Sequence, residues 1–182
     1  MGMYIAALAI EVAFAILVVA LFSSIFLSRR SGAPYYPTRK SAIREALKEA
    51  GLKPGESFYD LGAGTGKALL IAEKEFGARA TGFEISVLFY LIGKINLLVH
   101  RSHAALIKKN LFRADLGDAD VVFCFLAIRS MQRMEDKIKT GLKSGARIIV
   151  YAFPLPTMTP AKTITIHAKW KMFIYRKKAS NA

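Results

Sequence analysis

Three glycines at alternate positions stand between a short apolar stretch and a helical pattern. They are Gly62, Gly64 and Gly66, which follow the apolar residues 57–61 and precede the helical pattern of residues 68–76. Glycine at a strand-to-helix turn permits positive φ angles and lets a ligand approach the bare backbone. The unpaired N–H groups of the first helical turn point into the same space. The sequence therefore predicts a ligand site at the carboxyl end of a strand, where open α/β sheets bind ligands.

The spacing of these glycines differs from that of two common phosphate-binding loops. A dinucleotide fingerprint, G-x-G-x-x-G, needs its third glycine one residue later than Gly66. A P-loop needs Ser or Thr after Gly-Lys, and here Ala68 follows Lys67. What remains is an acidic residue, Asp60, followed by three alternate glycines. An ordinary tight turn between a strand and a helix stays open as an alternative.

A second acidic residue stands at the end of the next predicted strand. Glu84 closes residues 79–84 and lies about 20 residues beyond the glycines, which is the offset at which an acid reaches ribose hydroxyls in nucleotide-binding βαβ units. A carboxylate can accept hydrogen bonds from two vicinal hydroxyls. The alternative is a solvated glutamate at a strand end.

An acid followed by these glycines resembles the first motif of the class I S-adenosylmethionine-dependent methyltransferases. The resemblance implies that Asp60 lies near the methionine amino group of the cofactor, and that the glycine turn packs against its methionine and ribose portions. These enzymes usually carry an aspartate at the position of Asn110, where it contacts the adenine amino group. The side-chain carbonyl of Asn110 can accept the same hydrogen bond. The expected cofactor-binding residues therefore also include Glu84, Asn110, the adjacent Leu111, and Phe125 after the fourth strand pattern.

Two proline-containing segments narrow the resemblance. Tyr35 and Tyr36 stand between two prolines in a Pro-aromatic-x-Pro-Thr sequence, and Phe153 begins a Phe-Pro-x-Pro turn after the fifth strand pattern. With them the chain is similar, over about residues 34–173, to the small membrane-associated lysine methyltransferases of the ATP synthase c subunit and the adenine nucleotide carrier, and to their prokaryotic relatives. That family often has Asn-Pro after the ribose-binding acid and a proline at the position of Ile128, and this chain has neither.

The resemblance implies a site that aligns an amine with the methyl group of the cofactor. Because the cofactor supplies an activated methyl group, the protein mainly aligns the reacting atoms. A dehydrated, aromatic-lined channel lowers the pKa of a substrate lysine, and aromatic faces attract a methylated ammonium group. Phe125 and Phe153 are candidates for this lining, and packing of aromatic residues against the sheet is the alternative. The remaining candidates are Tyr35 and Tyr36 as catalytic residues that line the channel, and Pro37 and Thr38 bordering the cofactor.

The N-terminal segment has the length and composition of a membrane anchor. Residues 3–27 are almost wholly apolar, with Glu11 as their only charge. As a helix this segment is ~37 Å long, enough to cross a hydrocarbon core of ~30 Å with some tilt. No Lys or Arg precedes it, and Arg29 and Arg30 follow it. We therefore expect residues 1–30 to form a single-pass anchor, with the domain of residues 31–182 on the cytoplasmic side.

The chain is strongly basic, with 27 Lys and Arg against 13 Asp and Glu and a net charge of +14. All of these cations lie beyond residue 28, and such a domain is attracted to an anionic membrane surface. RNA binding is the competing interpretation of the same charge. Many methyltransferases that modify base amino groups carry Asn/Asp-Pro-Pro-aromatic after the fourth strand, where residues 125–128 here read Phe-Leu-Ala-Ile. A nucleic-acid substrate is therefore disfavoured.

The residues that commonly bind metals are sparse. Cys124 is the only cysteine, which excludes an internal disulfide and argues against a thiolate zinc site. His100, His103 and His167 do not have metal-ligand spacing. We therefore expect no metal cofactor.

The remaining periodicity predicts an α/β fold of the Rossmann-like class I methyltransferase type, with a mostly parallel sheet. Residues 163–167 and 170–175 alternate like half-buried strands, and we expect them to close a seven-stranded sheet as an antiparallel hairpin. The leading hypothesis is a membrane-anchored protein-lysine N-methyltransferase that acts near the membrane surface. The alternatives are methylation of a lipid, quinone or other small molecule, and a catalytically inactive membrane-tethered binding module.

Overall fold

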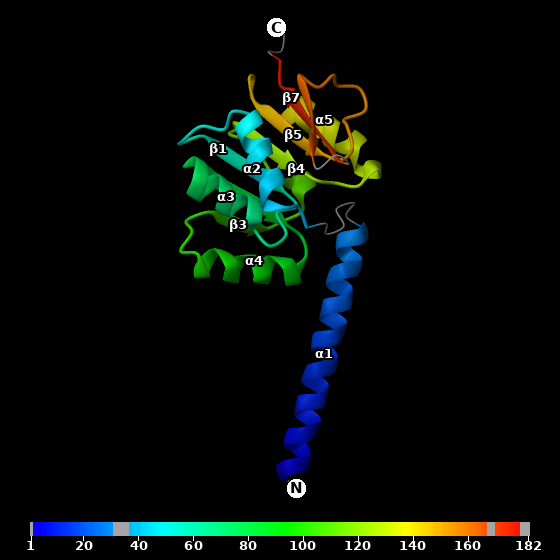
Figure 1. Ribbon diagram of the computed structural model, residues 1–182. Coiled ribbons are helices and arrows are strands. Elements are labelled where there is room, and N and C mark those ends of the chain that lie inside the picture. Colours follow the sequence, from blue (N-terminus) through cyan, green and yellow to red (C-terminus); the bar gives the residue numbers. More distant parts are fainter. Residues whose placement is uncertain (1, 31–36, 167–169, 179–182) are drawn as a thin grey trace.

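The structure is a computed structural model that describes residues 2–30, 37–166 and 170–178 (Figure 1). Within the first helix, the side chains of residues 17, 20–22 and 24–30 are also outside the description.

Among the described residues, seven strands form one sheet in the order β3-β2-β1-β4-β5-β7-β6. The neighbours among β1 to β5 run parallel, whereas β7 is antiparallel to both β5 and β6. The strands are β1 Ser57–Leu61, β2 Arg79–Glu84, β3 Ala105–Lys108, β4 Val121–Cys124, β5 Arg147–Tyr151, β6 Lys162–Ile166 and β7 Trp170–Arg176. The predicted mostly parallel sheet with a C-terminal antiparallel hairpin is confirmed.

Helices cover both faces of this sheet (Figure 1). They are α2 Lys40–Glu49, α3 Lys67–Phe76, α4 Val87–Val99 and α5 Met131–Gly141, with short 3-10 turns η1 Leu111–Arg113 and η2 Ile128–Ser130. Apolar residues of α2 and α3 share one core with Phe58 and Ile149, while those of α5 share the other with Val122 and Ile148. Because consecutive strand residues point to opposite faces, the adjacent Ile148 and Ile149 belong to different cores.

Helix α1 Gly2–Arg30 extends away from the domain as one long helix (Figure 1). Many of its described apolar side chains are exposed, Leu8 and Phe14 among them. Residues 3–27, predicted as a membrane anchor, lie within this helix, and their role as an anchor stays a prediction. When only the described residues are considered, no helix has both the length and the hydropathy of a membrane span. The division of the chain at residues 30 and 31 stays a prediction, because residues 31–36 lie outside the description.

Candidate active site

The glycine turn joins β1 to α3 and is tied to the neighbouring strand. Gly62, Gly64 and Gly66 have φ angles of 92°, 52° and 76°, which side chains other than glycine rarely adopt. The N–H groups of Gly62 and Ala63 both donate to the carbonyl of Phe83, at 2.9 and 3.1 Å. The end of β2 therefore fixes the position of the turn.

A cavity opens above this turn, at the carboxyl ends of β1, β2 and β4. It contains about 740 Å³ of space, part of it open to solvent. Its walls combine the glycine turn, two carboxylates and several apolar side chains. The lining residues are Pro37, Thr38, Ile43, Asp60, Gly62, Ala63, Gly64, Thr65, Lys67, Ala68, Phe83, Glu84, Ile85, Phe89, Leu111, Phe123 and Phe125. Eight of the residues predicted from the sequence to bind the cofactor are thus brought together: Pro37, Thr38, Asp60, Gly62, Gly64, Glu84, Leu111 and Phe125.

Glu84 connects the glycine turn to the start of α4. One carboxylate oxygen accepts the N–H of Gly64 at 2.8 Å, and the other accepts the N–H of Ser86 at 2.7 Å. The residue is 7% exposed. Burial raises the pKa of Glu84, although the N–H groups of Ser86 and Gly64 favour its ionised form. The carboxylate is therefore held rigidly at the edge of the cavity, with lone pairs left to accept further hydrogen bonds.

Asp60 is the second buried carboxylate of the cavity and is 4% exposed. Burial, with a smaller contribution from the charge of Glu84, raises the pKa of Asp60 to about 8. A cationic group that entered the cavity would stabilise the ionised form of Asp60. The pair therefore creates a site that favours a ligand with a positive charge.

Asn110 does not line this cavity, although its neighbour Leu111 does. Strand β3 ends at Lys108, and Asn110 begins the turn η1 that follows. Its side-chain oxygen accepts the N–H of Phe112 at 3.0 Å, the local bond with which asparagine commonly competes against regular strand structure. Its contact with adenine stays a prediction, and the structure gives Asn110 a role in capping the turn.

Gly66 is a further predicted residue that is not among the described lining of the cavity. Gly66 faces α4: a Cβ atom there would lie 3.5 Å from a methyl carbon of Leu97. Tyr35 and Tyr36 lie outside the described residues. The next two residues in the chain line the cavity.

A second cavity has one lining residue in common with the first. The two share Phe125, and the second is lined by Phe125, Leu126, Ala127, Ile128, Arg129, Phe153 and Trp170. The ring of Phe125 meets Tyr151 edge-on at 4.7 Å between centroids, and Tyr151 stacks on Trp170 at 6.1 Å. A row of three aromatic rings therefore leads from the first cavity to Trp170. Phe153, predicted to line an aromatic channel, lies in this second cavity.

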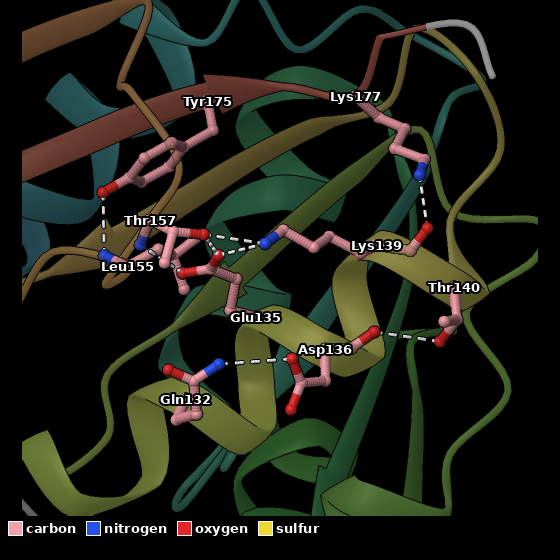
Figure 2. A network of polar contacts seen from close by, with 9 residues as sticks. All are labelled: Gln132, Glu135, Asp136, Lys139, Thr140, Leu155, Thr157, Tyr175 and Lys177. Carbon is pink, nitrogen blue, oxygen red and sulfur yellow. Dashed lines mark hydrogen bonds and ion pairs between the residues drawn. The ribbon is translucent and has the colours of Figure 1, made fainter. Parts of the chain in front are cut away.

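The turn that carries Phe153 is held by the polar network of Figure 2. The buried Glu135 of α5 accepts hydrogen bonds from the backbone N–H of Thr157, at 2.8 Å, and from the hydroxyl of Thr157. It also forms an ion pair with the ammonium group of Lys139. The N–H of Leu155 donates to the Tyr175 hydroxyl at 2.9 Å. Burial alone would raise the pKa of Glu135, but its bonds to Lys139 and Thr157 lower it. These bonds fix the Phe-Pro-x-Pro turn and the following Thr157 against α5 and β7.

The sequence did not predict several residues of the site. Two of them are glycines, whose lack of a side chain lets neighbouring elements pack closely. A Cβ atom on Gly93 of α4 would lie 3.0 Å from the carbonyl oxygen of Gly64, and one on Gly82 of β2 would lie 2.6 Å from Ala63. Cys124 is not part of the site: it is fully buried, and burial raises the pKa of its thiol to about 12. Among the described residues, no group of three His, Cys, Asp or Glu side chains could hold a metal ion.

The family model of the ANTKMT methyltransferase domain matches residues 60–162, which is more than half of the chain. The chain belongs to this family. It is 29% identical over 136 residues to a protein-lysine N-methyltransferase of Saccharolobus islandicus, a match that covers 73% of this chain and 84% of that protein. It is 30% identical over 135 residues to the adenine nucleotide translocase lysine N-methyltransferase of Mus musculus, covering 72% of this chain and 58% of the mouse protein.

Solved structures of methyltransferases have the same fold as this chain. An RNA methyltransferase of Salinibacter ruber, in complex with S-adenosyl-L-homocysteine, superposes with a TM-score of 0.77 at 22% identity and covers 81% of this chain and 97% of its own. A methyltransferase of Pyrococcus furiosus gives a TM-score of 0.66 at 20% identity and covers 80% of this chain and 88% of its own. Family and fold together make this chain an S-adenosylmethionine-dependent methyltransferase.

The cavity of this ANTKMT-family chain fits the cofactor. S-adenosylmethionine carries a cationic sulfonium and an amino group, which suit a cavity with two buried carboxylates. Its ribose hydroxyls can donate to the lone pairs of Glu84 that the backbone leaves unused. Leu111 and Phe89 add apolar surface for a purine ring. The residues that would hold the cofactor are therefore those that the glycine turn and β2 place together.

Proposed function

We propose that this enzyme methylates the side-chain amine of a lysine in a protein, close to a membrane surface. The observation that carries the proposal is that the two cavities share Phe125: its ring lines the site with two buried carboxylates and also begins an aromatic row that continues to Tyr151. The names of the relatives from Saccharolobus islandicus and Mus musculus support a lysine acceptor.

The chain itself must position the cofactor and the amine. When bound, S-adenosylmethionine supplies a methyl group activated by its sulfonium, so the amine needs alignment more than acid–base assistance. Asp60 offers a carboxylate to the cationic part of the cofactor, and Glu84 offers lone pairs to its ribose. Phe125 stands between the two cavities, where its ring excludes water from the approaching amine. Exclusion of water favours the neutral amine, which is the form with a free electron pair.

The aromatic row provides an approach for the acceptor. A lysine side chain that passes Trp170 and Tyr151 gains contact between its methylene groups and the rings, and its ammonium can interact with the ring faces. We extend this proposal to Tyr35 and Tyr36, which precede the cavity-lining Pro37 in the chain.

Membrane anchoring by residues 3–27 is part of the proposal. Helix α1 has 29 residues and exposes most of its described apolar side chains. The cavity-lining Pro37 follows the last residue of α1, Arg30, by seven residues (37 − 30). Seven extended residues reach at most about 25 Å, so an anchor would hold the cavity within that distance of the end of α1. The basic flank Arg29–Arg30 places the domain on the cytoplasmic side in this proposal.

The second candidate function is methylation of an apolar small molecule of the membrane. The second cavity favours it, because Ile128 is 66% exposed there and Arg129 is the only charged residue among the described lining.

Radioactive methyl transfer separates the two candidates. The full-length protein, purified in detergent, is incubated with membranes of a strain that lacks the gene and with methyl-labelled cofactor. We expect the label in protein, on a lysine identified by mass spectrometry. Label in the organic phase alone would establish the small-molecule function instead. A protein that binds no S-adenosylmethionine in calorimetry would refute both.

A further inference from the structure

Helix α4 is apolar on two opposite sides. Gly93 and Leu97 are buried against the domain, whereas Leu91, Ile95 and Leu98 are 53%, 62% and 77% exposed. The exposed residues recur at spacings of four and three, so they form one stripe along the helix. Val87, Ile92 and Val99 widen the stripe, with exposed fractions of 43%, 40% and 71%.

This composition is unusual for a helix at an aqueous surface. Lys94 is the only charged residue among the 13 of α4. Surface helices normally carry polar residues on their outer side, and a helix that is apolar all round is normally covered by something else. An exposed apolar stripe of this size is typical of a contact with a partner or a membrane.

The chain segment that contains the stripe is basic. Residues 85–114 contain five Lys and Arg and no Asp or Glu. All five cations are exposed: Lys94, Arg101, Lys108, Lys109 and Arg113. An apolar stripe within a basic, exposed segment matches an anionic lipid surface, which offers apolar chains below a layer of negative headgroups.

The position of α4 in the molecule fits the same partner. Helices α1 and α4 contact each other. Figure 1 shows α4 at the end of the domain from which α1 extends, and α4 runs across the direction of α1. A bilayer crossed by α1 would therefore have its surface parallel to the axis of α4.

We propose that α4 lies in the headgroup layer of an anionic bilayer, with Leu91, Ile95 and Leu98 directed toward the lipid chains. This rests on the proposed anchoring by α1. The 29 residues of α1 give a helix of about 43 Å, which exceeds a hydrocarbon core of ~30 Å by roughly 13 Å. That excess lets α1 rise through the headgroups beside α4.

The docked helix sets the height of the active site above the lipid. Phe89, in the first turn of α4, lines the cofactor cavity, and Glu84 bonds the N–H of Ser86 at the start of the helix. The cavity therefore opens beside the headgroup layer, where a lysine at the end of a transmembrane segment stands.

Spin labels at single cysteines test the contact directly. Cys124 is fully buried, so an introduced exposed cysteine is the thiol that reacts. The variants Leu91→Cys, Ile95→Cys and Leu98→Cys of the full chain are labelled and reconstituted into nanodiscs that contain phosphatidylglycerol. Thr163→Cys, exposed on β6 at the opposite edge of the sheet, is the matched control.

We expect the three labels on α4 to collide more with dissolved oxygen than with a water-soluble nickel chelate, and the label at Thr163 to show the reverse order. The double variant Lys108→Glu/Lys109→Glu should shift the α4 labels toward the aqueous order. Aqueous accessibility at all three α4 positions would overturn the inference, as would spin–spin broadening that shows a second copy on the stripe. Flotation of the same preparations with vesicles tests anchoring by α1 separately. If the chain floats while the α4 labels remain accessible to water, anchoring by α1 is supported and the contact of α4 with the bilayer is refuted.

Discussion

At the scale of single residues, the Glu84 carboxylate has two roles that the sequence could not separate. Its two oxygens accept N–H groups from Gly64 and Ser86, which belong to different elements. The same carboxylate lines the cavity that fits the cofactor. The sequence predicted an acid near a ribose from its distance to the glycines, but a distance along the chain says nothing of a bond that closes the turn itself.

Glu84→Gln should weaken both cofactor binding and stability. The amide would present an NH₂ group to one of two backbone N–H donors, and a lost hydrogen bond to a charged group costs about 1.5–3 kcal/mol. We expect a loss of about tenfold or more in cofactor affinity by calorimetry, and a lower urea midpoint. Asp118→Asn removes an exposed acid and should change neither. Wild-type affinity in Glu84→Gln would contradict the proposed ribose contact.

Asp60 should make the cofactor-free protein less stable as the pH rises. The native pKa of about 8 exceeds the unfolded value of about 3.9, so between these values the native state binds a proton that the unfolded state does not. Stability therefore falls as the pH rises through this window. We expect Asp60→Asn to remove this slope in urea unfolding at pH 5 to 8.

The same residue should release a proton when the cofactor binds. A cationic ligand stabilises the ionised carboxylate, so binding at pH 7 should expel a proton from Asp60. Calorimetry in buffers of different ionisation enthalpy measures this proton. Equal proton release by wild type and Asp60→Asn would show that another group titrates.

At the scale of elements, the contact between α4 and the glycine turn depends on one missing side chain. A Cβ atom on Gly93 would lie 2.5 Å from a methyl carbon of Leu106 and 3.0 Å from the Gly64 oxygen. The sequence alone does not indicate which residues of α4 face the turn. The packing of α4 against β3 decides which residues face the turn, and no local sequence pattern predicts that packing.

Gly93→Ala should push α4 away from the turn. Overpacking costs typically 1–3 kcal/mol, which outweighs the gain of about 1 kcal/mol in helix propensity. We expect a lower free energy of unfolding in urea and weaker cofactor binding. Gly141→Ala in α5 is the matched control, because a Cβ atom there meets nothing within 4 Å. Equal stability of the two variants would contradict close packing at Gly93.

The contact between α5 and the Phe-Pro-x-Pro turn should weaken in acid. The native pKa of Glu135 is lowered, so its contribution to stability is present above the unfolded pKa of ~4.3 and is lost as the pH falls through the native value. Glu135→Gln should cost about 1–3 kcal/mol at pH 7, and the difference from wild type should shrink below pH 4. The exposed Glu45→Gln serves as control. A difference that is constant with pH would show that ionisation of Glu135 is irrelevant.

At the scale of the whole molecule, the sequence predicted the sheet better than the site. Alternating and helical periodicities identified the strands and the C-terminal hairpin, because burial on a sheet or helix face leaves a local pattern. The pairing of β5 with β7 sets Tyr151 opposite Met172 and thereby brings Trp170 near Phe125. These residues are distant in the chain, so neither propensity nor spacing could place them together.

Trp170 is the only tryptophan of the chain, which gives the second cavity its own spectroscopic probe. Trp170→Ala should raise the KM for acceptor membranes about fivefold, since a cation–π contact contributes ~1 kcal/mol. Cofactor affinity should stay unchanged, and Trp170→Phe should restore most of the loss. Initial rates of methyl incorporation at varied amounts of membrane measure this. A fall in kcat alone would argue against a role of Trp170 in acceptor binding.

The short link between the end of α1 and Pro37 has a kinetic consequence. An enzyme anchored as proposed searches for its acceptor by lateral diffusion in two dimensions, and its rate follows the surface density of acceptors. A lysine within reach of so short a tether is present at a local concentration on the order of millimolar. Even weak contacts to the acceptor then suffice for turnover, while soluble proteins with the same local sequence escape modification.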